Sequence, residues 1–334
     1  MPRGPCSDWD AYVGAGVKSV LVTGATGTFG RAFIDSGQIG SLDRVVIYSR
    51  DEQKQEQMAR DFAGQSNLRF MLGDVRDYPR LLMAMRGIDT VVHAAALKIV
   101  PKCEYDPIEA VRTNVGGAEN VIRASIAAGV KNVIALSTDK AVSPVNLYGA
   151  TKLVAERLFI AANHLSGSPG NPDATLFSCV RYGNVSFSRG SVIPLFKKLS
   201  AEGKTLPITH PEMTRFWIRI NQAVAFVIQC LGKMEGGEVF IPRMPSFRIM
   251  DLADAFELEH TRIIGTHIVG MRVGEKIHET LITPHDTPNL MAGPDDWVIQ
   301  PEWRSPKHAL SDFTYSSDTN TEWLSVDDLR RMIR

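Results

Sequence analysis

Hydrophobic residues in the first half of the chain form short runs, and stretches with helical spacing separate these runs. The runs predict β-strands at residues 17–23, 44–49, 68–71, 90–94, 132–137 and 175–181. The stretches predict amphipathic helices at residues 29–36, 80–85, 118–128 and 148–163. The runs lack a clean apolar–polar alternation, which is typical of strands buried on both faces of a parallel sheet. The pattern therefore predicts an α/β fold with a Rossmann-like, doubly wound parallel sheet.

The regular alternation of strands and helices ends after Gly190. Prolines then divide the second half into shorter elements, at positions 194, 207, 211, 242 and 245. This composition favours a smaller, mixed α/β C-terminal lobe for the substrate. We expect an N-terminal extension at residues 1–16, the Rossmann domain at 17–190 and the substrate lobe at 191–334, with some segments of the lobe returning to the Rossmann domain.

The composition narrows the class of protein. Hydrophobic residues make up 44% and charged residues 22% of the 334 residues, as in ordinary globular proteins. The formal net charge is zero and no long run carries one sign, which argues against nucleic acid or an anionic membrane surface as the main partner. No apolar segment approaches the roughly 20 residues of a membrane span. Four scattered cysteines without a CxxC or Cys/His cluster predict neither disulfides nor a metal site, and favour the cytoplasm.

The first predicted strand runs directly into a glycine-rich loop, "TGATGTFG". Gly24 allows a tight turn, Gly27 allows the backbone to approach a pyrophosphate, and Gly30 allows the next helix to pack closely on the strand. The phosphates would then lie on the helix N-terminus, where free N–H groups and the helix dipole favour negative charge. A glycine pattern alone is weak, but this one lies between the first strand and the first helix. We expect cofactor contacts from Gly24, Thr26, Gly27, Thr28, Phe29 and Gly30.

The end of the second strand predicts which dinucleotide binds. It carries Ser49 and Arg50, with Asp51 one residue beyond. A guanidinium and a hydroxyl suit the 2′-phosphate of NADP, so we expect NADP rather than NAD. The alternative is that Arg50 is a solvated loop charge and Asp51 binds the ribose of NAD. Further cofactor contacts are expected at the ends of the third and fourth strands, from Asp74, Val75, Ala94, Ala95 and Ala96.

The candidate chemistry lies in "STDKAVSPVNLYGATK", residues 137–152. Tyr148 and Lys152 are four residues apart, so they share one face of the predicted helix. A tyrosine with a pKa of about 10 is a poor base at neutral pH, but a nearby ammonium and a positively charged nicotinamide ring stabilise its phenolate. A Tyr-x-x-x-Lys pair is common by chance. Here the pair lies downstream of the glycine loop and follows Thr138, whose hydroxyl stands at a strand end. In this context the pair indicates nicotinamide-dependent redox chemistry in which both Tyr148 and Lys152 take part.

The glycine loop, "HAAALK", Thr138 and the Tyr148/Lys152 pair resemble the extended short-chain dehydrogenase/reductase superfamily. Within it, the chain is similar to the inverting UDP-N-acetylglucosamine 4,6-dehydratases (5-epimerising). The similarity extends from about Val17 to the end of the chain. It rests on "YSRDEQKQ", "STDKAVSPVNLYGATK", "RYGNV", "SRGSVIPLF", "PEMTRFWI", "RVGEKIHE" and "YSSDTNTEWLS".

The resemblance implies a reaction in three stages. Tyr148 removes the proton of the sugar 4-hydroxyl while hydride passes from C4 to the cofactor, and Thr138 hydrogen-bonds the same oxygen. Lys140 then removes the C5 proton, Asp139 protonates the departing C6 hydroxyl, and the hydride returns to C6. Retaining relatives carry Asp-Glu in place of Asp139-Lys140, so the lysine implies inversion at C5. Without the resemblance, Asp139 would be interpreted as a turn cap and Lys140 as a solvated lysine.

The resemblance also implies the partners. A UDP-amino sugar would contact Lys98, Asn184, Arg272 and Glu275, and Arg272 is the strongest candidate because a diphosphate suits a guanidinium fork. Each of these residues can instead be an ordinary surface residue. A homo-oligomer in the cytoplasm, without a metal, is expected. The chain departs from the group at Ile99, where a histidine is common.

Three other functions are open from the sequence. A UDP-sugar 4-epimerase or 4-reductase needs Thr138, Tyr148 and Lys152 but not Asp139 and Lys140. A retaining 4,6-dehydratase would use the same stages and leave C5 unchanged. A non-catalytic nucleotide sensor with this fold is the third, but a pure binding protein needs no proton donor and acceptor, and fold alone does not decide function.

Overall fold

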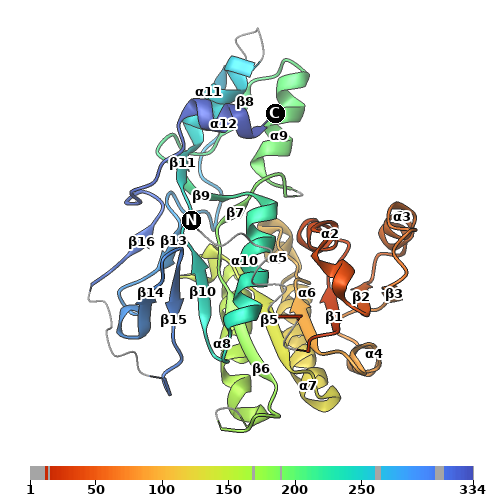
Figure 1. The fold of residues 1–334 in the computed structure, drawn as a ribbon. Helices are drawn as coiled ribbons and strands as arrows, with labels where there is room; N and C mark the ends of the chain where they lie inside the picture. Colours follow the sequence, from red (N-terminus) through yellow and green to blue (C-terminus); the bar gives the residue numbers. More distant parts are fainter. Residues whose placement is uncertain are drawn as a thin grey trace.

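A large twisted sheet runs through the molecule (Figure 1). The computed structural model describes residues 12–13, 16–167, 170–188, 190–259, 265–304 and 312–333. In these residues the sheet has nine strands in the order β14-β15-β10-β6-β5-β4-β1-β2-β3. The six strands predicted from the sequence are all present, as β1 (Ser19–Thr23), β2 (Arg44–Ser49), β3 (Leu68–Leu72), β4 (Thr90–His93), β5 (Asn132–Leu136) and β6 (Leu176–Val180).

These six strands pair in parallel throughout. The strand order reverses between β1 and β4, where a doubly wound sheet opens a crevice for ligands at the carboxyl ends of its strands. The prediction of a Rossmann-like fold is therefore confirmed. The predicted helices are also present, as α2 (Thr28–Asp35), α4 (Tyr78–Met85), α7 (Gly117–Ala128) and α8 (Leu147–Ser166).

Three short helices were not predicted: α3 (Glu52–Asp61), α5 (Val100–Tyr105) and α6 (Pro107–Val111). Helix α3 is almost entirely polar and buries only Gln55 and Met58, so its sequence has little hydrophobic period to detect. Its start is fixed instead by Asp51, whose carboxylate accepts a hydrogen bond from the Lys54 N–H at 3.0 Å. A π-helical turn, Arg112–Gly116, joins α6 to α7.

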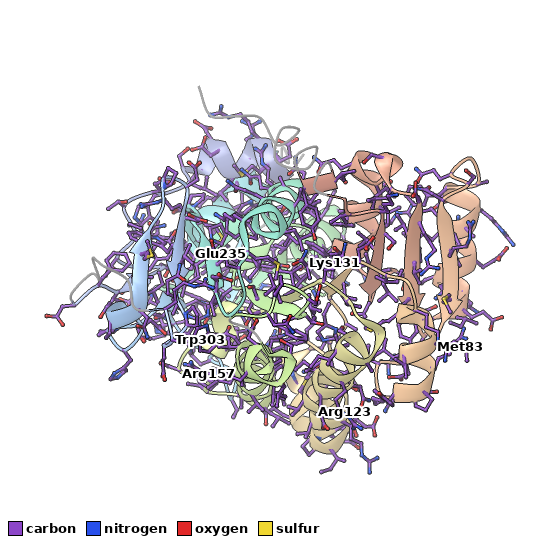
Figure 2. The ribbon with its side chains drawn as sticks, turned by 60° about the horizontal axis from the view of Figure 1, so that its bottom comes forward. Met83, Arg123, Lys131, Arg157, Glu235 and Trp303 are labelled. Atoms are coloured by element: carbon purple, nitrogen blue, oxygen red, sulfur yellow. The ribbon has the colours of Figure 1, made fainter. Side chains whose placement is uncertain are left out.

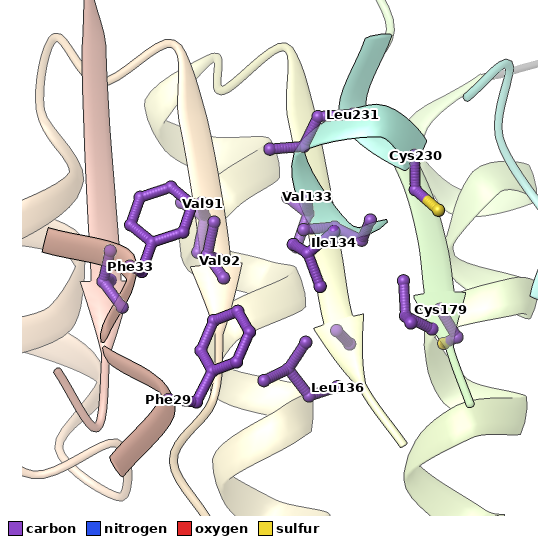
Figure 3. Packing of buried hydrophobic residues seen from close by; sticks show 14 of the residues in the cluster. Phe29, Phe33, Val91, Val92, Val133, Ile134, Leu136, Cys179, Cys230 and Leu231 are labelled. Carbon is purple, nitrogen blue, oxygen red and sulfur yellow. The ribbon is translucent and has the colours of Figure 1, made fainter. Parts of the chain in front are cut away.

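The core lies between the sheet and the helices that cover its faces (Figure 3). On one face Phe29 and Phe33 of α2 lie beside Val91 of β4, and Leu231 comes from α10 (Ile220–Lys233). Helices α4, α7 and α8 pack against one another as a second layer. Each fully buried aliphatic or aromatic side chain of this kind contributes about 1.5–3 kcal/mol, so the sheet that carries the site is rigid.

Segments from the C-terminal half extend the large sheet at one edge. Strand β10 (Val239–Pro242) pairs in parallel with β6, and β15 (Asp296–Ile299) and β14 (Leu290–Ala292) follow in antiparallel pairs. Most of the remaining elements form a smaller mixed lobe with its own apolar core, as predicted, whereas Leu281, Ile282 and Tyr315 belong to the core of the large sheet. These remaining elements are β7 (Asn184–Val185), α9 (Val192–Ala201), β8 (Leu206–Ile208), β9 (Thr214–Ile218), β11 (Ser246–Arg248), α11 (Ile249–Glu259), β12 (Thr266–Ile268), β13 (Thr280–Ile282), β16 (Tyr315–Ser316) and α12 (Val326–Ile333).

The expected N-terminal extension is described only in part, because residues 1–11 lie outside the described residues. Tyr12, within that extension, is buried against the sheet, and its hydroxyl lies 2.7 Å from the Thr90 hydroxyl. The Asn132 side chain donates to the same oxygen at 3.1 Å. This residue therefore packs as part of the Rossmann core. Among the described helices, none combines the length and apolarity needed to cross a bilayer.

Candidate active site

One cavity of about 1110 Å³ opens at the carboxyl ends of the central strands. Residues of the Rossmann sheet line one part of it and residues of the C-terminal lobe line another. All the cofactor, catalytic and substrate residues proposed from the sequence lie on its wall: Gly24, Thr26, Gly27, Thr28, Phe29, Gly30, Ser49, Arg50, Asp74, Val75, Ala94, Ala95, Ala96, Lys98, Thr138, Asp139, Lys140, Tyr148, Lys152, Asn184, Arg272 and Glu275.

The glycine loop forms the floor of the cofactor half. Gly24 has φ +65°, and a Cβ there would lie 2.8 Å from the Cα of Ala95, so no other residue fits without displacing the end of β4. Helix α2 begins at Thr28, and Gly27 provides no side-chain cap. The first residues of α2, Thr28, Phe29 and Gly30, line the cavity, and the positive end of the helix dipole there fits a pyrophosphate.

Two cations stand at the end of β2. Arg50 and Lys54 both line the cavity there, and Lys54 is a residue that the sequence analysis did not single out. Asp51 caps α3 and forms an ion pair with Lys54. The Ser49 hydroxyl accepts a hydrogen bond from Gln55 at 3.1 Å. This end of the cavity therefore carries two cations, and the Asp51 carboxylate beside them already has partners.

Asp74, expected at the adenine edge, is held by an arginine. Its carboxylate accepts from Arg76 at 2.7 Å (Nη2) and 3.0 Å (Nε), and Arg50 lies 3.5 Å away. Partial burial opposes ionisation, but the Arg76 contacts outweigh it and hold the pKa of Asp74 below its usual range. The carboxylate is thus fixed and negatively charged at neutral pH.

The end of β4 gives the cofactor half its small side chains, Ala94, Ala95 and Ala96. The Thr23 hydroxyl accepts from the N–H groups of Ala94 and Ala95 at 3.2 and 3.3 Å and lies 2.8 Å from His93 Nδ1. Burial, followed by repulsion from Lys152, lowers the pKa of His93 to about 3. His93 is therefore a neutral, packed strand-end residue.

The catalytic turn and the catalytic helix are packed directly on each other. Residues 139–141 form a single 3₁₀ turn after β5. Helix α8 follows, and Asn146 caps it by accepting from the Gly149 N–H at 2.8 Å. A side chain at Gly149 would clash with the Lys140 carbonyl, so the glycine is what allows this contact. The close packing brings Tyr148 beside Lys140.

Tyr148 is buried next to Cys103 and Ala110. Burial raises the pKa of Tyr148 to about 12, while the Lys140 charge and a hydrogen bond with Thr138 act in the opposite direction. Lys152, four residues further on, donates to the Leu136 carbonyl at 2.6 Å. The cation that favours the phenolate in this structure is therefore that of Lys140, a contribution that the sequence analysis assigned to Lys152.

Asp139, which is buried, forms an ion pair with Lys140, whose side chain is 25% exposed. The Lys140 ammonium lies 3.1 Å from Asp139 Oδ1, and the Thr138 hydroxyl donates to the same oxygen at 2.8 Å. Burial alone would lower the pKa of Lys140, but the carboxylates of Asp139 and Glu279 outweigh it and raise that pKa above its usual value. Lys140 is therefore charged at neutral pH. Asp139 Oδ2 is buried without a hydrogen-bond partner in the described structure, which leaves it available to a substrate hydroxyl.

The C-terminal lobe adds charged residues that the sequence analysis missed. Glu279 lies 3.3 Å from the Lys140 ammonium, and Arg215 lies 3.9 Å from the same carboxylate oxygen. Both residues line the cavity. Glu279 lies within "RVGEKIHE" and Arg215 within "PEMTRFWI". Because both residues are far from Lys140 in the sequence, no residue spacing links them to it.

The proposed substrate residues lie on the remaining wall. Asn184 Oδ1 is buried and lacks a hydrogen-bond partner among the described atoms. Arg272 lies 3.9 Å from Glu275, with more than half of the arginine side chain exposed. Partial burial and repulsion from Lys140 lower the pKa of Lys98. Ile99, where the chain departs from the resembled group, also lines the cavity.

The site can move protons between the two ends of a hydrogen-bonded chain. Thr138 joins the Tyr148 phenol to the Asp139 carboxylate, because its hydroxyl bonds to both. Tyr148 can act at one substrate oxygen and Asp139 at another, with the Lys140 ammonium beside them. The described residues include no cluster of three His, Cys, Asp or Glu side chains suited to a metal ion.

A buried ion pair supports α8 from behind. Arg181 binds Glu156 through two hydrogen bonds, at 2.5 and 3.2 Å, and Ser137 donates to the same carboxylate at 2.7 Å. A third bond runs from Arg181 to the Leu281 carbonyl at 2.7 Å. The pair thus joins α8, β6 and β13 immediately behind the catalytic turn.

Glu156→Gln is expected to lower the free energy of unfolding by about 3–5 kcal/mol, because it leaves a buried guanidinium without its counter-charge. Urea denaturation measures the change. The control is Glu119→Gln, which breaks the exposed pair with Arg123 on the surface of α7 (Figure 2) and should cost less than about 1 kcal/mol. Equal losses for the two variants would contradict a structural role for the buried pair.

Comparison with known proteins places the chain among enzymes of nucleotide sugars. The sequence pattern described as "Polysaccharide biosynthesis protein" matches residues 20–300. UDP-N-acetylglucosamine 4,6-dehydratase (inverting) of Campylobacter jejuni is 44% identical over 335 residues, which cover 95% of this chain and 97% of that protein. UDP-glucose 4-epimerase of Rickettsia conorii is also 44% identical, over 332 residues that cover 95% of each chain.

Solved structures agree on the fold. Pen from Bacillus thuringiensis is 38% identical and superposes with a TM-score of 0.87, covering 95% of this chain and 98% of that one. The dTDP-glucose 4,6-dehydratase DesIV of Streptomyces venezuelae, solved with NAD bound, is 22% identical with a TM-score of 0.70, covering 78% and 86%. A family pattern over most of the sequence and near-full-length relatives of this identity show that the chain belongs to the polysaccharide biosynthesis protein family, in agreement with the extended short-chain dehydrogenase/reductase resemblance of its motifs.

Proposed function

We propose that the protein is an inverting UDP-N-acetylglucosamine 4,6-dehydratase that produces a UDP-2-acetamido-2,6-dideoxy-hexos-4-ulose. The observation that carries this proposal is the Asp139–Lys140 ion pair beside Thr138 and Tyr148 in one cavity. Redox chemistry at C4 needs only a tyrosine and a hydroxyl, whereas loss of water needs a further acid and a further base. The Campylobacter relatives carry the same function in their names.

The first stage is oxidation at C4. Tyr148 takes the proton of the 4-hydroxyl, and the Thr138 hydroxyl, bonded to the tyrosine, lies where it can bind the same substrate oxygen. The bound nicotinamide supplies the redox chemistry by accepting hydride from C4 and later returning it to C6. Since Tyr148 is a phenol at neutral pH, its own proton must leave as it takes the new one.

Thr138 provides the route for that proton. Its hydroxyl donates to Asp139 at 2.8 Å while bonding to Tyr148, so a proton that enters at the tyrosine can emerge on the Asp139 carboxyl. We propose that this transfer converts Asp139 into the acid that protonates the departing C6 hydroxyl. The proton of the 4-hydroxyl then leaves as part of the water molecule. The proton that the leaving group needs therefore comes from the substrate itself.

The second stage needs a base at C5. The 4-keto group acidifies the C5 proton, and Lys140 is the proposed base that removes it. Substrate covers the ion pair and lowers the local dielectric constant, which favours the uncharged amine over the ammonium. Inversion at C5 requires that the new proton reaches C5 on the ring face opposite the one from which Lys140 removed the first, so solvent rather than the lysine supplies it.

We propose NADP as the cofactor. The nicotinamide class is supported by solved neighbours that bind NAD, but those proteins share only the fold with this chain. The preference for NADP rests on Arg50 and Lys54 at the end of β2, and on Asp51, which is already engaged in capping α3. A 2′-phosphate would complement both cations.

Arg50→Ala is expected to weaken NADPH binding by roughly 10- to 100-fold, because it removes charge-assisted hydrogen bonds worth about 1.5–3 kcal/mol. NADH binding should change by less than about threefold. Fluorescence titration of both cofactors measures the two effects. The control is Arg60→Ala, which removes an exposed arginine of α3. Equal weakening of both cofactors would contradict a 2′-phosphate site at Arg50.

The competing function is a UDP-sugar 4-epimerase, because the Rickettsia relatives of equal identity carry that name. An epimerase does not use Asp139 and Lys140. Incubation with UDP-N-acetylglucosamine followed by proton NMR separates the functions. A C6 methyl group with a 4-keto group supports dehydration, and ring coupling constants show whether C5 is inverted. An intact C6 alcohol in the product would contradict the proposed function.

The wider assignments remain part of the same proposal. We propose that residues 17–190 bind the cofactor and that the UDP-amino sugar binds between this domain and the C-terminal lobe, through Lys98, Asn184, Arg272 and Glu275. A homo-oligomer in the cytoplasm is proposed as well. The free state of Cys103, Cys179 and Cys230 fits a reducing compartment.

A further inference from the structure

Glu279 is a buried carboxylate aimed at the catalytic lysine from the opposite lobe. The residue is 2% exposed and lies directly before β13. Its backbone is fixed on both sides by Ser317, which accepts from the Glu279 N–H at 2.9 Å and donates its own N–H to the Glu279 carbonyl at 2.8 Å. The Lys140 ammonium consequently lies between two carboxylates, 3.1 Å from Asp139 and 3.3 Å from Glu279.

The other charges around Glu279 leave its carboxylate only partly satisfied. Arg215 lies 3.9 Å from Oε1 and Lys276 lies 3.8 Å from Oε2. Both cations use their N–H groups elsewhere: Arg215 donates to the Ile277 carbonyl at 2.8 Å and Lys276 to the Val142 carbonyl at 2.6 Å. Glu279 Oε2 is therefore buried without a hydrogen-bond partner in the described part of the chain. A buried carboxylate oxygen in this state can hold a proton with little further loss of hydration.

The elimination needs two proton-holding groups beside the substrate. Asp139 must carry a proton in order to give it to the C6 hydroxyl, and Lys140 must lose one in order to take the C5 proton. A single carboxyl group that already holds the first proton has no basic site left for the second. The lysine proton therefore needs a different acceptor, and Glu279 is the other carboxylate in contact with Lys140.

We propose that Glu279 is a positioning residue that accepts the Lys140 proton, and thereby frees the lysine amine to remove the C5 proton of the substrate. This inference rests on the proposed dehydratase function. In the transfer an N–H bond of the ammonium breaks, an O–H bond forms on Glu279, and no electrons are exchanged with the cofactor. The lysine then holds the C5 proton as an ammonium, a proton from solvent reaches C5 on the opposite ring face, and Glu279 releases its proton to solvent, so the site regains its starting state.

The test compares the two chemical stages in Glu279→Gln, with Glu212→Gln as the control. Glu212 is exposed in the same lobe and does not line the cavity. In single turnovers with UDP-N-acetylglucosamine, transient NADPH absorbance reports C4 oxidation and NMR of quenched samples reports the C6 methyl group. We expect the glutamine variant to oxidise C4 within about threefold of the normal rate and to form the methyl group about 100-fold more slowly, the usual loss for a proton-transfer group.

The pH dependence separates proton acceptance from a purely structural role. Without Glu279 the Lys140 proton must leave to solvent, so elimination by Glu279→Gln should rise by about tenfold per pH unit between pH 7 and 9, while the normal enzyme stays nearly flat. Glu279→Asp retains a carboxylate and should keep the flat profile at a reduced rate. If Glu279→Gln failed to bind NADPH, the pH profile of elimination by Glu279→Asp would test the role of Glu279 instead. A flat profile supports proton acceptance by the carboxylate.

Two results would overturn the inference. The first is normal elimination by Glu279→Gln, and the second is a loss that affects both stages equally at every pH. Either result, obtained while the normal enzyme forms the C6 methyl group, leaves the proposed function in place. An enzyme that forms no C6 methyl group from this substrate overturns the proposed function itself, and the role of Glu279 with it.

Discussion

Lys140→Ala is expected to reduce loss of the C6 hydroxyl by about 100-fold or more, while C4 oxidation and NADPH binding persist. The lysine is the proposed base at C5, and a proton-transfer group typically contributes about 10²–10⁴-fold. Its ammonium contacts Asp139 and Glu279, so the alanine variant also loses the cation between two buried carboxylates. The reaction should therefore stop at the 4-keto sugar with an intact C6 alcohol, and transient NADPH should accumulate.

NMR of the quenched reaction measures this outcome directly. Lys131→Ala is the matched control, because Lys131 is an exposed lysine (Figure 2) on the loop that enters β5, the strand that leads to the catalytic turn. Asp139→Asn should also form no C6 methyl group, since an amide has no acidic proton for the leaving oxygen, and it should slow C4 oxidation as well, because the amide cannot accept the proton that leaves Tyr148. Normal turnover by either the Lys140 or the Asp139 variant would show that these residues do not perform the elimination.

The fold could be predicted where the sequence carries a local period. Six strands of the sheet are short, mainly apolar runs, and their parallel arrangement follows from the glycine loop and the rules of βα units. Helix α3 could not be predicted from periodicity because it is fixed by the Asp51 cap rather than by a hydrophobic face. Strands β10, β14 and β15 join the sheet edge through long-range pairing, which short segments do not encode locally.

The residues of the candidate site also differ in whether the sequence alone reveals them. Thr138 and Tyr148 were found from their place and spacing within one motif, Asp139 was found from the family resemblance of that motif, and all three line one cavity. Glu279 contacts Lys140 only because the C-terminal lobe folds back over the turn, so no spacing connects the two residues in the sequence. The partner of Lys152 could not be foreseen either, since a backbone carbonyl, that of Leu136, has no sequence signature.

Tyr148→Phe is expected to block even the first hydride transfer, with a loss of about 10²–10⁴-fold and no transient NADPH absorbance. The phenylalanine ring preserves the packing against Cys103 and Ala110, so folding and cofactor binding should be retained. The missing hydroxyl removes both the acceptor of the 4-hydroxyl proton and the link to Thr138. Stopped-flow absorbance measures the transient, and Tyr182→Phe, another buried tyrosine on the cavity wall, should still form it within about threefold of the normal rate. A Tyr148→Phe enzyme that reduced its cofactor as fast as the Tyr182→Phe enzyme would show that another group takes the proton of the C4 hydroxyl.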